Sequence, residues 1–495
     1  MSVENSDPKN KDEFNLDDYL EKNSQMNEDV RSSIGTMERT GERKWVYPKK
    51  PKGKFTTYRT YVSYVLLAIL ILTPFFKLPN GNPLFKFDVL QSQFILFGFP
   101  FFTSDFFLLA LGMITTIIFI VLFTMAYGRL FCGWVCPQTI FLEMVFRKIE
   151  YAIEGDRAKQ IRLDKQDWDE EKIRKKLLKW TIFAILSFII ANVFLAYIIG
   201  ADSLYSVIKE GPADNIGTLV GLVIFSAMFY FVFAWFREQA CTLVCPYGRF
   251  QGVLIDAHTI NVAYDFKRGE GTAGRAKFKK NEDRKAEGKG DCIDCGQCVA
   301  VCPTGIDIRN GIQLECVNCT ACIDACDEVM VKVGLPTGLI RYASEDDIIR
   351  GEKFKFTKRL AAYTFALLLL IGAMTAFLFS RSDVESKYLK VPGTDYKVEG
   401  QYYVNQFEYT LYNKTNADQI VSLKLLSHKD SKIEMFEGAN NLNMEKGQII
   451  QGNFYLKIPM NEVKSYKEKI VIGLVNQKGK VIDKYETSFS APFKY

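Results

Sequence analysis

Residues 291–327 read DCIDCGQCVAVCPTGIDIRNGIQLECVNCTACIDACD, and this stretch decides the fold of the central part of the chain. It contains the spacing C-x2-C-x2-C-x3-C twice, which is typical of bacterial ferredoxins that hold two 4Fe-4S clusters. Three closely spaced thiolates surround one face of a cluster, and the fourth, after a short helical turn, reaches the other cluster. The spacing therefore predicts two ligand sets, which are Cys292, Cys295, Cys298 and Cys326 for one cluster, and Cys316, Cys319, Cys322 and Cys302 for the other.

The alternative for this doubled motif is a pair of zinc sites. Zinc motifs normally pair two C-x2-C units across a longer gap, so the doubled four-cysteine run favours iron–sulfur clusters. Pro303 follows the first run, as the ferredoxin pattern expects, whereas Asp327 stands where the second proline would be. That proline is not a ligand, and the prediction is unchanged. Two adjacent clusters imply transfer of single electrons but name neither the donor nor the acceptor.

The positions of the cysteines and histidines limit the kinds of metal centre that the chain could hold. All 12 cysteines among the 495 residues fall in close groups at metal-ligand spacing, which indicates a reducing compartment rather than a disulfide framework. The two histidines, His258 and His428, lie outside the apolar runs. This usage excludes a bis-histidine haem held within a membrane and a histidine-rich copper centre of the oxidase type.

Five apolar stretches are long enough to cross a bilayer as helices. They lie near residues 58–76, 106–126, 178–199, 216–236 and 360–379. The second stretch, FFLLALGMITTIIFIVLFTMA, carries no charge, whereas the first has Arg59 at its start. We therefore predict a multi-domain membrane protein with a five-helix transmembrane bundle.

The loops between these stretches predict the orientation. Residues 1–57 and 127–177 each carry 11 Lys and Arg, whereas the loops 77–105 and 200–215 carry two and one. Loops rich in Lys and Arg stay in the cytoplasm. We expect a bacterial inner (cytoplasmic) membrane protein without a secretory signal, with its N-terminus and ferredoxin domain in the cytoplasm and its C-terminal domain in the periplasm.

A second cysteine motif, C-x3-C-P, occurs twice. Cys132-Gly-Trp-Val-Cys136-Pro follows the second apolar stretch, and Cys241-Thr-Leu-Val-Cys245-Pro follows the fourth. Residues at i and i+4 share one face of a helix, so each pair is expected to present two thiols side by side before proline ends or bends the helix. The repetition suggests an internal duplication. An arginine upstream of each pair, Arg129 or Arg237, is expected to lower the pKa of the thiols.

Several roles fit these four cysteines. Soft thiolates suit Cu(I). Two dithiols can also cycle to disulfides and carry electrons, or ligate a further iron–sulfur centre. The plain structural reading is a set of small buried residues that allow close helix packing. Repetition with the same Val-Cys-Pro ending favours a redox or metal role.

After the last apolar stretch the chain becomes β-rich. Segments such as YKVEGQYYVNQFEYTLYNKT alternate apolar and polar residues between turn signals, and this predicts an immunoglobulin-like β-sandwich. The expected domains are a cytoplasmic tail over 1–57, a four-helix membrane region over 58–250, a basic linker over 251–290, a ferredoxin domain over 291–345, a fifth transmembrane helix over 360–379, and a periplasmic immunoglobulin-like domain over 385–495.

Together these features resemble the CcoG/FixG/RdxA family, the polyferredoxin-like accessory proteins of cytochrome c oxidase. The stretches CGWVCPQTIF, CTLVCPYGRFQ, CPTGIDIRNGIQLECVNCTACIDACD and GLIRY (338–342) are similar to the family's motifs. The resemblance runs from about residue 40 to the C-terminus.

The resemblance implies a role in assembling cbb-type oxidases, with reduction of Cu(II) to Cu(I) for copper delivery. Copper thereby becomes a candidate ligand of Cys132, Cys136, Cys241 and Cys245, beside two 4Fe-4S clusters on the other eight cysteines. It further implies cupric-reductase-type oxidoreductase activity. The expected partners are the membrane, oxidase subunits or copper chaperones and an unidentified cytoplasmic electron donor, with no nucleic acid.

Two other functions stay open. A quinol dehydrogenase like the NapH family has C-x3-C-P repeats and a two-cluster insert but four spans, so the fifth span and the sandwich favour the first function. A non-enzymatic assembly scaffold would use its clusters only to stabilise the fold.

Overall fold

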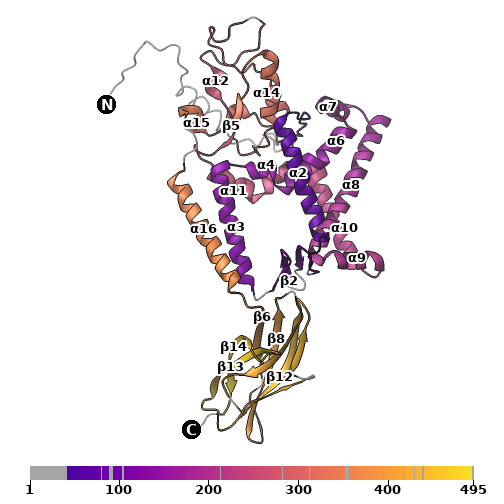
Figure 1. Ribbon diagram of the computed structural model, residues 1–495. Coiled ribbons are helices and arrows are strands. Elements are labelled where there is room, and N and C mark those ends of the chain that lie inside the picture. Colours follow the sequence, from indigo (N-terminus) through magenta and orange to yellow (C-terminus); the bar gives the residue numbers. More distant parts are fainter. Residues whose placement is uncertain are drawn as a thin grey trace, which may run out of the picture. The chain divides into compact units, whose positions relative to one another are not determined.

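The computed structural model describes residues 42–79, 81–88, 93–102, 105–211, 213–280, 282–311, 313–351, 356–393, 395–415, 417–428, 430–436 and 440–492. The chain forms two compact units (Figure 1). The first comprises residues 1–72, 114–194 and 207–370, and the second comprises residues 73–113, 195–206 and 371–495. The predicted tail over 1–57 lies mostly outside the described residues.

Five helices among the described residues are long and apolar enough to cross a membrane. They are α2 (Lys54–Leu72) with its continuation η1 (Thr73–Phe75), α3 (Phe106–Tyr127), α8 (Glu170–Ile199), α10 (Ile216–Tyr230) with its continuation η4 (Phe231–Phe236), and α16 (Lys358–Phe379). The predicted multi-pass membrane protein is confirmed by these five helices. Helix α8 begins earlier than the apolar pattern predicts because its charged first turns find partners, such as Glu154 for Lys176 and Lys179.

Short helices follow the second and fourth of these spans. They are α4 (Leu130–Trp134), α5 (Pro137–Ile140), η3 (Phe141–Phe146), α6 (Arg147–Ile153) and α7 (Arg157–Lys165) after α3, and η5 (Ala240–Val244) and α11 (Pro246–Leu254) after η4. Phe146 of the first group stacks on Phe233 of η4 with ring centroids 4.8 Å apart and meets Phe183 edge to face. Phe131 of α4 meets Tyr247 of α11 edge to face at 6.1 Å, which joins the two groups. The two C-x3-C-P segments are therefore packed into one body.

The ferredoxin domain, residues 261–350, is built around a two-stranded sheet. Strand β4 (Asn261–Tyr264) pairs antiparallel with β5 (Ile340–Ala343). Its helices are α12 (Phe266–Glu270), α13 (Gln297–Ala300), η6 (Ile308–Asn310), α14 (Ala321–Val333) and α15 (Glu345–Arg350). Figure 1 shows α12, α14, α15 and β5 gathered near one end of α2. Strand β4 lies within the predicted linker 251–290, and its four residues are buried because they pair with β5.

The second unit contains a small meander that the sequence did not predict. Strands β1 (Phe85–Asp88), β2 (Gln93–Leu96) and β3 (Phe99–Phe102) pair antiparallel, and α9 (Ala201–Glu210) belongs to the same unit. Asp105, after β3, forms ion pairs with Arg381 and Lys414 at 2.7 and 2.5 Å. These buried charges fasten the meander to the start of the C-terminal domain.

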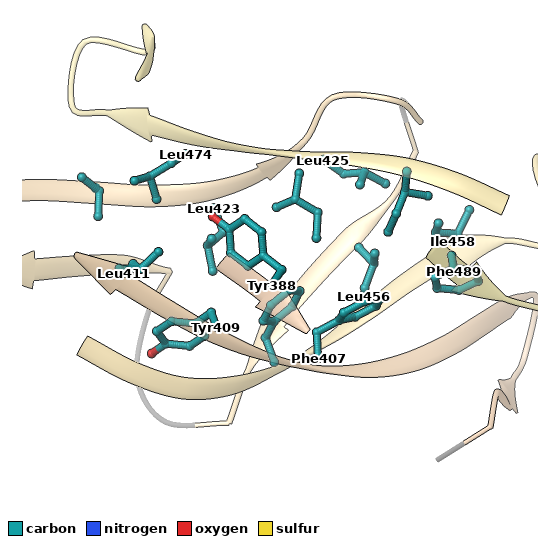
Figure 2. Close-up of a cluster of buried hydrophobic side chains, with 14 of the residues drawn as sticks. Tyr388, Phe407, Tyr409, Leu411, Leu423, Leu425, Leu456, Ile458, Leu474 and Phe489 are labelled. Atoms are coloured by element: carbon teal, nitrogen blue, oxygen red, sulfur yellow. The ribbon is translucent and has the colours of Figure 1, made fainter. Parts of the chain in front are cut away.

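The C-terminal domain is the predicted β-sandwich. Its strands are β6 (Val384–Lys390), β7 (Lys397–Glu399), β8 (Tyr402–Asn413), β9 (Gln419–Leu425), β10 (Lys432–Met435), β11 (Asn441–Met444), β12 (Ile449–Pro459), β13 (Lys467–Asn476) and β14 (Val481–Ser490). One sheet has the order β10-β12-β8-β6, with β7 beside β8, and the other has the order β11-β9-β13-β14. Figure 2 shows Phe407 and Leu456 of the first sheet and Leu423 of the second among the buried side chains of the core.

Candidate electron-transfer site

The first cysteine set lines one cavity. Cys292, Cys295, Cys298 and Cys326 border one small cavity, with Tyr264 and Met330 among its other lining residues. Three of the cysteines come from the loop around α13 and the fourth comes from α14. The structure thus brings together the four residues that the spacing groups as the first ligand set, and their ligation of a cluster stays a prediction.

The second set lines a neighbouring cavity. Cys302, Cys316, Cys319 and Cys322 border this second cavity, and Cys298 of the first set also lines it. The remaining lining is mainly apolar, with Val262, Ile306, Ile308 and Val317. The crossed arrangement matches the spacing argument, in which the last cysteine of each run belongs to the other run's set.

The two cysteine loops share one backbone conformation. Asp294 and Gly296, on either side of Cys295, have φ of +50° and +65°. Asn318 and Thr320, on either side of Cys319, have φ of +52° and +64°. Left-handed φ is costly for a β-branched residue such as Thr320, and such strain persists where the surroundings impose it, as at functional sites.

The donor set of these cavities fits iron–sulfur clusters. Burial raises the pKa of Cys298 and Cys326 to about 12, and that of Cys316 and Cys319 to about 12 and about 11. Positive charge from bound iron would let such thiols ionise. In the described part of the chain no three His, Cys, Asp or Glu side chains converge on a single ion. A cluster does not require this convergence, because each of its four thiolates binds a different iron.

The C-x3-C-P pairs do not lie on one helix face each, and this prediction is wrong. Cys132 lies in α4 and Cys241 in the π-helical turn η5, whereas Cys136 and Cys245 stand just before α5 and α11. The reason is the following proline, which excludes helical backbone from the residue before it. Cys136 has ψ of 123° and Cys245 has ψ of 111°. Each proline begins the next helix.

The four thiols of the two pairs nevertheless lie close enough to influence one another. Burial, together with the neighbouring thiols of Cys136 and Cys132, raises the pKa of Cys241 to about 12. The pKa of Cys132 is also raised, first by burial, although Arg129 opposes this. For Cys132 and Cys241 the predicted lowering of the thiol pKa is therefore wrong in net direction, since burial outweighs the charge of Arg129.

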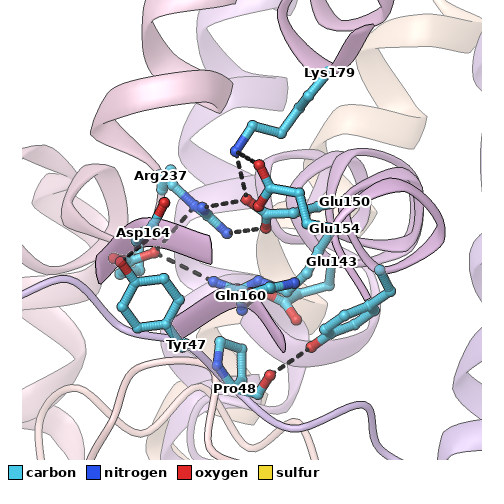
Figure 3. Close-up of polar contacts among 12 residues, drawn as sticks. Tyr47, Pro48, Glu143, Glu150, Glu154, Gln160, Asp164, Lys179 and Arg237 are labelled. Carbon is cyan, nitrogen blue, oxygen red and sulfur yellow. Dashed lines mark hydrogen bonds and ion pairs between the residues drawn. The ribbon is translucent and has the colours of Figure 1, made fainter. Parts of the chain in front are cut away.

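Arg237 is engaged elsewhere, in a buried network of charges (Figure 3). Its guanidinium donates two hydrogen bonds to Glu150, at 3.1 and 2.8 Å, and Lys179 lies 3.3 Å from the same carboxylate. Burial alone would raise the pKa of Glu150, but Arg237 and Lys179 hold it at about 2. The φ of Arg237 is +51°, so the ion pair helps to hold a strained turn directly before the Cys241 segment.

The first C-x3-C-P segment packs directly on the second cysteine cavity. A methyl group at Gly133 would lie 2.4 Å from the carbonyl oxygen of Val317 and 2.8 Å from that of Asn318. Cys132 belongs to the same packed apolar cluster as Val317 and Cys319. The indole of Trp134 donates a hydrogen bond to the Tyr342 hydroxyl at 3.2 Å. The Cys132 segment therefore lies beside the second set, not the first.

Buried polar side chains hold this contact. Arg59 of α2, 4% exposed, donates from Nε to the Gly133 carbonyl oxygen at 2.6 Å. The Cys132 thiol donates to Oε1 of the fully buried Gln251 at 3.4 Å, and Arg129 donates to the same oxygen at 2.9 Å. The sequence reasoning did not identify Arg59 or Gln251 as part of the site. A charge at the beginning of an apolar span is the signal that could have found Arg59.

Comparison with known proteins bears on the same regions. Residues 236–345 match the family model described as a 4Fe-4S dicluster domain, residues 374–492 match the IG-like fold at the C-terminal of FixG, and residues 109–154 match a 4Fe-4S binding domain. RdxB of Cereibacter sphaeroides is 34% identical over 357 residues, which is 70% of this chain and 74% of RdxB. The chain belongs to the RdxA/FixG family.

Two other members of the RdxA/FixG family are also similar. RdxA of Cereibacter sphaeroides is 38% identical over 61% of this chain, and FixG of Rhizobium meliloti is 37% identical over 62% of it. The matches span 63% of RdxA and 58% of FixG, less than two thirds of either protein. As a member of this family, the chain has a 4Fe-4S dicluster domain and an immunoglobulin-like C-terminal domain of the FixG type.

Proposed function

We propose that this membrane protein reduces Cu(II) to Cu(I) at its C-x3-C-P thiols during assembly of a cbb-type cytochrome c oxidase. The observation that carries the proposal is the packing of the Cys132 segment on the loop of Cys319. It places a group of soft thiols directly beside one of the two cysteine cavities. A thiol site beside an electron source is what reductive capture of copper requires.

The chemistry needs one electron for each Cu(II) ion. Clusters held by the two cysteine sets would supply single electrons. Cu(II) prefers nitrogen and oxygen ligands and Cu(I) prefers thiolates, so reduction beside Cys132, Cys136, Cys241 and Cys245 couples electron transfer to capture of the product ion.

The surrounding side chains would control the protons of these thiols. The buried thiols of Cys132 and Cys241 carry protons at neutral pH, because burial raises their pKa. Metal binding must release those protons. Gln251 accepts from the Cys132 thiol, and the nearby Arg129 guanidinium favours the thiolate that remains. Copper capture is then expected to strengthen as pH rises.

The orientation and partners complete the proposal. The Lys and Arg of the loops favour a cytoplasmic ferredoxin domain and a periplasmic C-terminal sandwich. The sandwich would contact oxidase subunits or copper chaperones, since edges and loops of such domains commonly serve protein contacts.

The test uses the full chain, purified anaerobically in detergent with its clusters reduced. Cu(II) is added while cluster absorbance and formation of Cu(I) with a chromogenic chelator are followed together. A Cys136→Ser/Cys245→Ser variant is compared with a Val135→Ala/Val244→Ala control, which changes exposed side chains on the same two segments. We expect one Cu(I) per electron from the wild type and the control, and loss of at least about tenfold in rate for the cysteine variant.

Two results would overturn the proposal. Equal rates in both variants would show that the C-x3-C-P thiols are not the copper site. If Cu(II) does not oxidise the reduced clusters but a quinone does, the result would favour the quinol dehydrogenase instead.

A further inference from the structure

The two cysteine cavities differ in their access to solvent. All twelve cysteines lie in the described part of the chain, and Cys295 alone among them is exposed. The neighbouring Asp294 carboxylate is half-exposed and is paired with Arg309 at 2.5 Å. The first cavity therefore has an open edge at Cys295, whereas the cysteines of the second set are buried or half-buried.

A basic loop, residues 271–290, is fastened beside the first cysteine set. Its two ends form a bridge between Gly271 and Lys289, and Ala273 N donates to Gly288 O at 2.8 Å. Arg284 in the loop donates to the backbone carbonyl oxygens of Gly290 and Cys292, at 2.7 and 3.3 Å. The base of the loop is thus held against the backbone of a first-set cysteine.

The charges of this loop are unevenly compensated. Its acidic residues are largely engaged within the domain, since Glu282 pairs with both Arg284 and Lys289. Four exposed lysines make no ion pair with any residue that the structure describes; they are Lys277, Lys279, Lys280 and Lys285. Phe278, 42% exposed, stands among them. The loop therefore presents a positive surface with an aromatic side chain at its centre.

We propose that the basic loop and the open edge at Cys295 form the docking surface for an acidic protein that carries single electrons. Contacts between redox proteins are small and are steered by complementary charge, and an exposed aromatic ring adds apolar contact at the centre. The carrier gives up one electron and the cluster on the first set accepts it, with no bond made or broken. The proposal concerns the donor side and does not depend on whether copper is the acceptor.

The position of the loop favours a protein over a lipid surface. Figure 1 shows the segment after α12 on the side of the ferredoxin domain that faces away from α2. A nucleic acid would gain nothing from an open edge at a redox group. A soluble electron carrier needs both features, the charge for encounter and the open edge for transfer.

The experiment uses the full chain in neutral detergent and a flavodoxin with fully reduced flavin as the acidic donor. One electron leaves the flavin, which becomes the semiquinone, and the rate is measured by stopped flow at several salt concentrations. The variant Lys277→Glu/Lys279→Glu/Lys280→Glu/Lys285→Glu is compared with Lys467→Glu/Lys469→Glu/Lys478→Glu/Lys480→Glu, which makes the same charge change on exposed lysines of the C-terminal sandwich.

We expect the loop variant to be reduced at least about tenfold more slowly at low salt, with a flatter dependence on salt, and the sandwich variant to match the wild type. Binding of oxidised flavodoxin, measured by surface plasmon resonance, should weaken in parallel. Reduced methyl viologen, a small cation, should still reduce the loop variant at least as fast as the wild type, which shows intact clusters. Replacing the same four lysines by glutamine should slow reduction by flavodoxin less than replacing them by glutamate.

Equal flavodoxin rates and affinities in the two Glu variants would overturn the proposal. It would also fall if the loop variant loses binding to anionic phospholipid vesicles while its reaction with flavodoxin is unchanged, because the loop would then be a lipid-binding surface.

Discussion

The two cysteine cavities have the same spacing and the same left-handed turns, yet their surroundings differ. The first is open at Cys295 and lies beside a loop of exposed lysines. The second is covered by the Gly133 turn, which packs against the carbonyl oxygens of Val317 and Asn318. The motif is the same in both cavities, and in our proposals the open first cavity accepts electrons while the covered second cavity delivers them to the C-x3-C-P thiols. Mutations on either side of the molecule would test this difference between the two cavities.

The largest effect is expected from removing one cysteine of each set. Cys295→Ser and Cys319→Ser should each lose about half of the bound iron, because each disrupts one of two clusters. Cys295→Ser should abolish reduction by a protein donor. Cys319→Ser should leave that reduction in place and abolish delivery to the C-x3-C-P thiols. Iron analysis and electron paramagnetic resonance of the reduced proteins distinguish the two, and an identical loss of function in both would contradict separate ends.

The next largest effect is expected from disrupting the buried charge network that precedes the second C-x3-C-P segment. Glu150→Gln removes the carboxylate that accepts both hydrogen bonds of Arg237 and pairs with Lys179, and leaves Glu238 and Glu154 as their remaining buried counter-charges. About 3 kcal/mol of stability should be lost. Thermal unfolding in detergent measures it. Glu171→Gln, which removes an exposed partner of Lys175, is the matched control and should change stability by less than about 1 kcal/mol.

The low pKa of Glu150 also predicts that the stability of the protein depends on pH. The folded-state pKa of about 2 lies below the ordinary value of 4.5, so the unfolded chain binds the proton more readily. The stabilisation is present above pH 4.5 and is lost as pH falls from 4.5 towards 2. Unfolding of the wild type should become easier over that interval, and Glu150→Gln should show a weaker acid dependence. An unchanged acid profile would show that Glu150 is not held ionised.

A smaller effect should follow from filling the contact at the second cavity. Gly133→Ala places a methyl group against two backbone carbonyls that cannot rotate away, so the turn must shift, at a cost of about 1–3 kcal/mol. Both clusters should remain, while electron delivery to the thiols slows. Gly217→Ala, with open space at the added methyl group, is the control. If Gly133→Ala transferred electrons to the thiols at the wild-type rate, this contact would not be needed for electron transfer.

The smallest effects concern the paired left-handed positions. Gly296→Ala meets no side chain and costs only backbone strain, about 1 kcal/mol. Thr320→Gly removes such strain but also the hydroxyl that donates to the Cys319 carbonyl oxygen at 2.6 Å, so its net change should be under about 1 kcal/mol. Thermal unfolding of the two proteins compares them. A larger loss in Thr320→Gly than in Gly296→Ala would show that the threonine side chain, not the turn, is what the second loop needs.

Local patterns in the sequence determined the elements of this protein. Cysteine spacing predicted the two sets that share cavities, and apolar runs predicted the five long helices. Alternation of apolar and polar residues between turn signals predicted the sandwich. These features depend on residues that are close together along the chain, so they can be read directly from the sequence.

Only the tertiary structure decided which cysteine is exposed, which cavity meets the C-x3-C-P thiols, and which charges pair. Arg59 reaches Gly133 and Arg237 reaches Glu150 across more than 70 intervening residues. Burial outweighs the charge of Arg129 at Cys132, which reverses the pKa shift expected from sequence. Packing between distant segments sets solvent exposure and electrostatic environment. The sequence alone therefore predicted the two cysteine sets but could not show which set is open to solvent and which set meets the first C-x3-C-P segment.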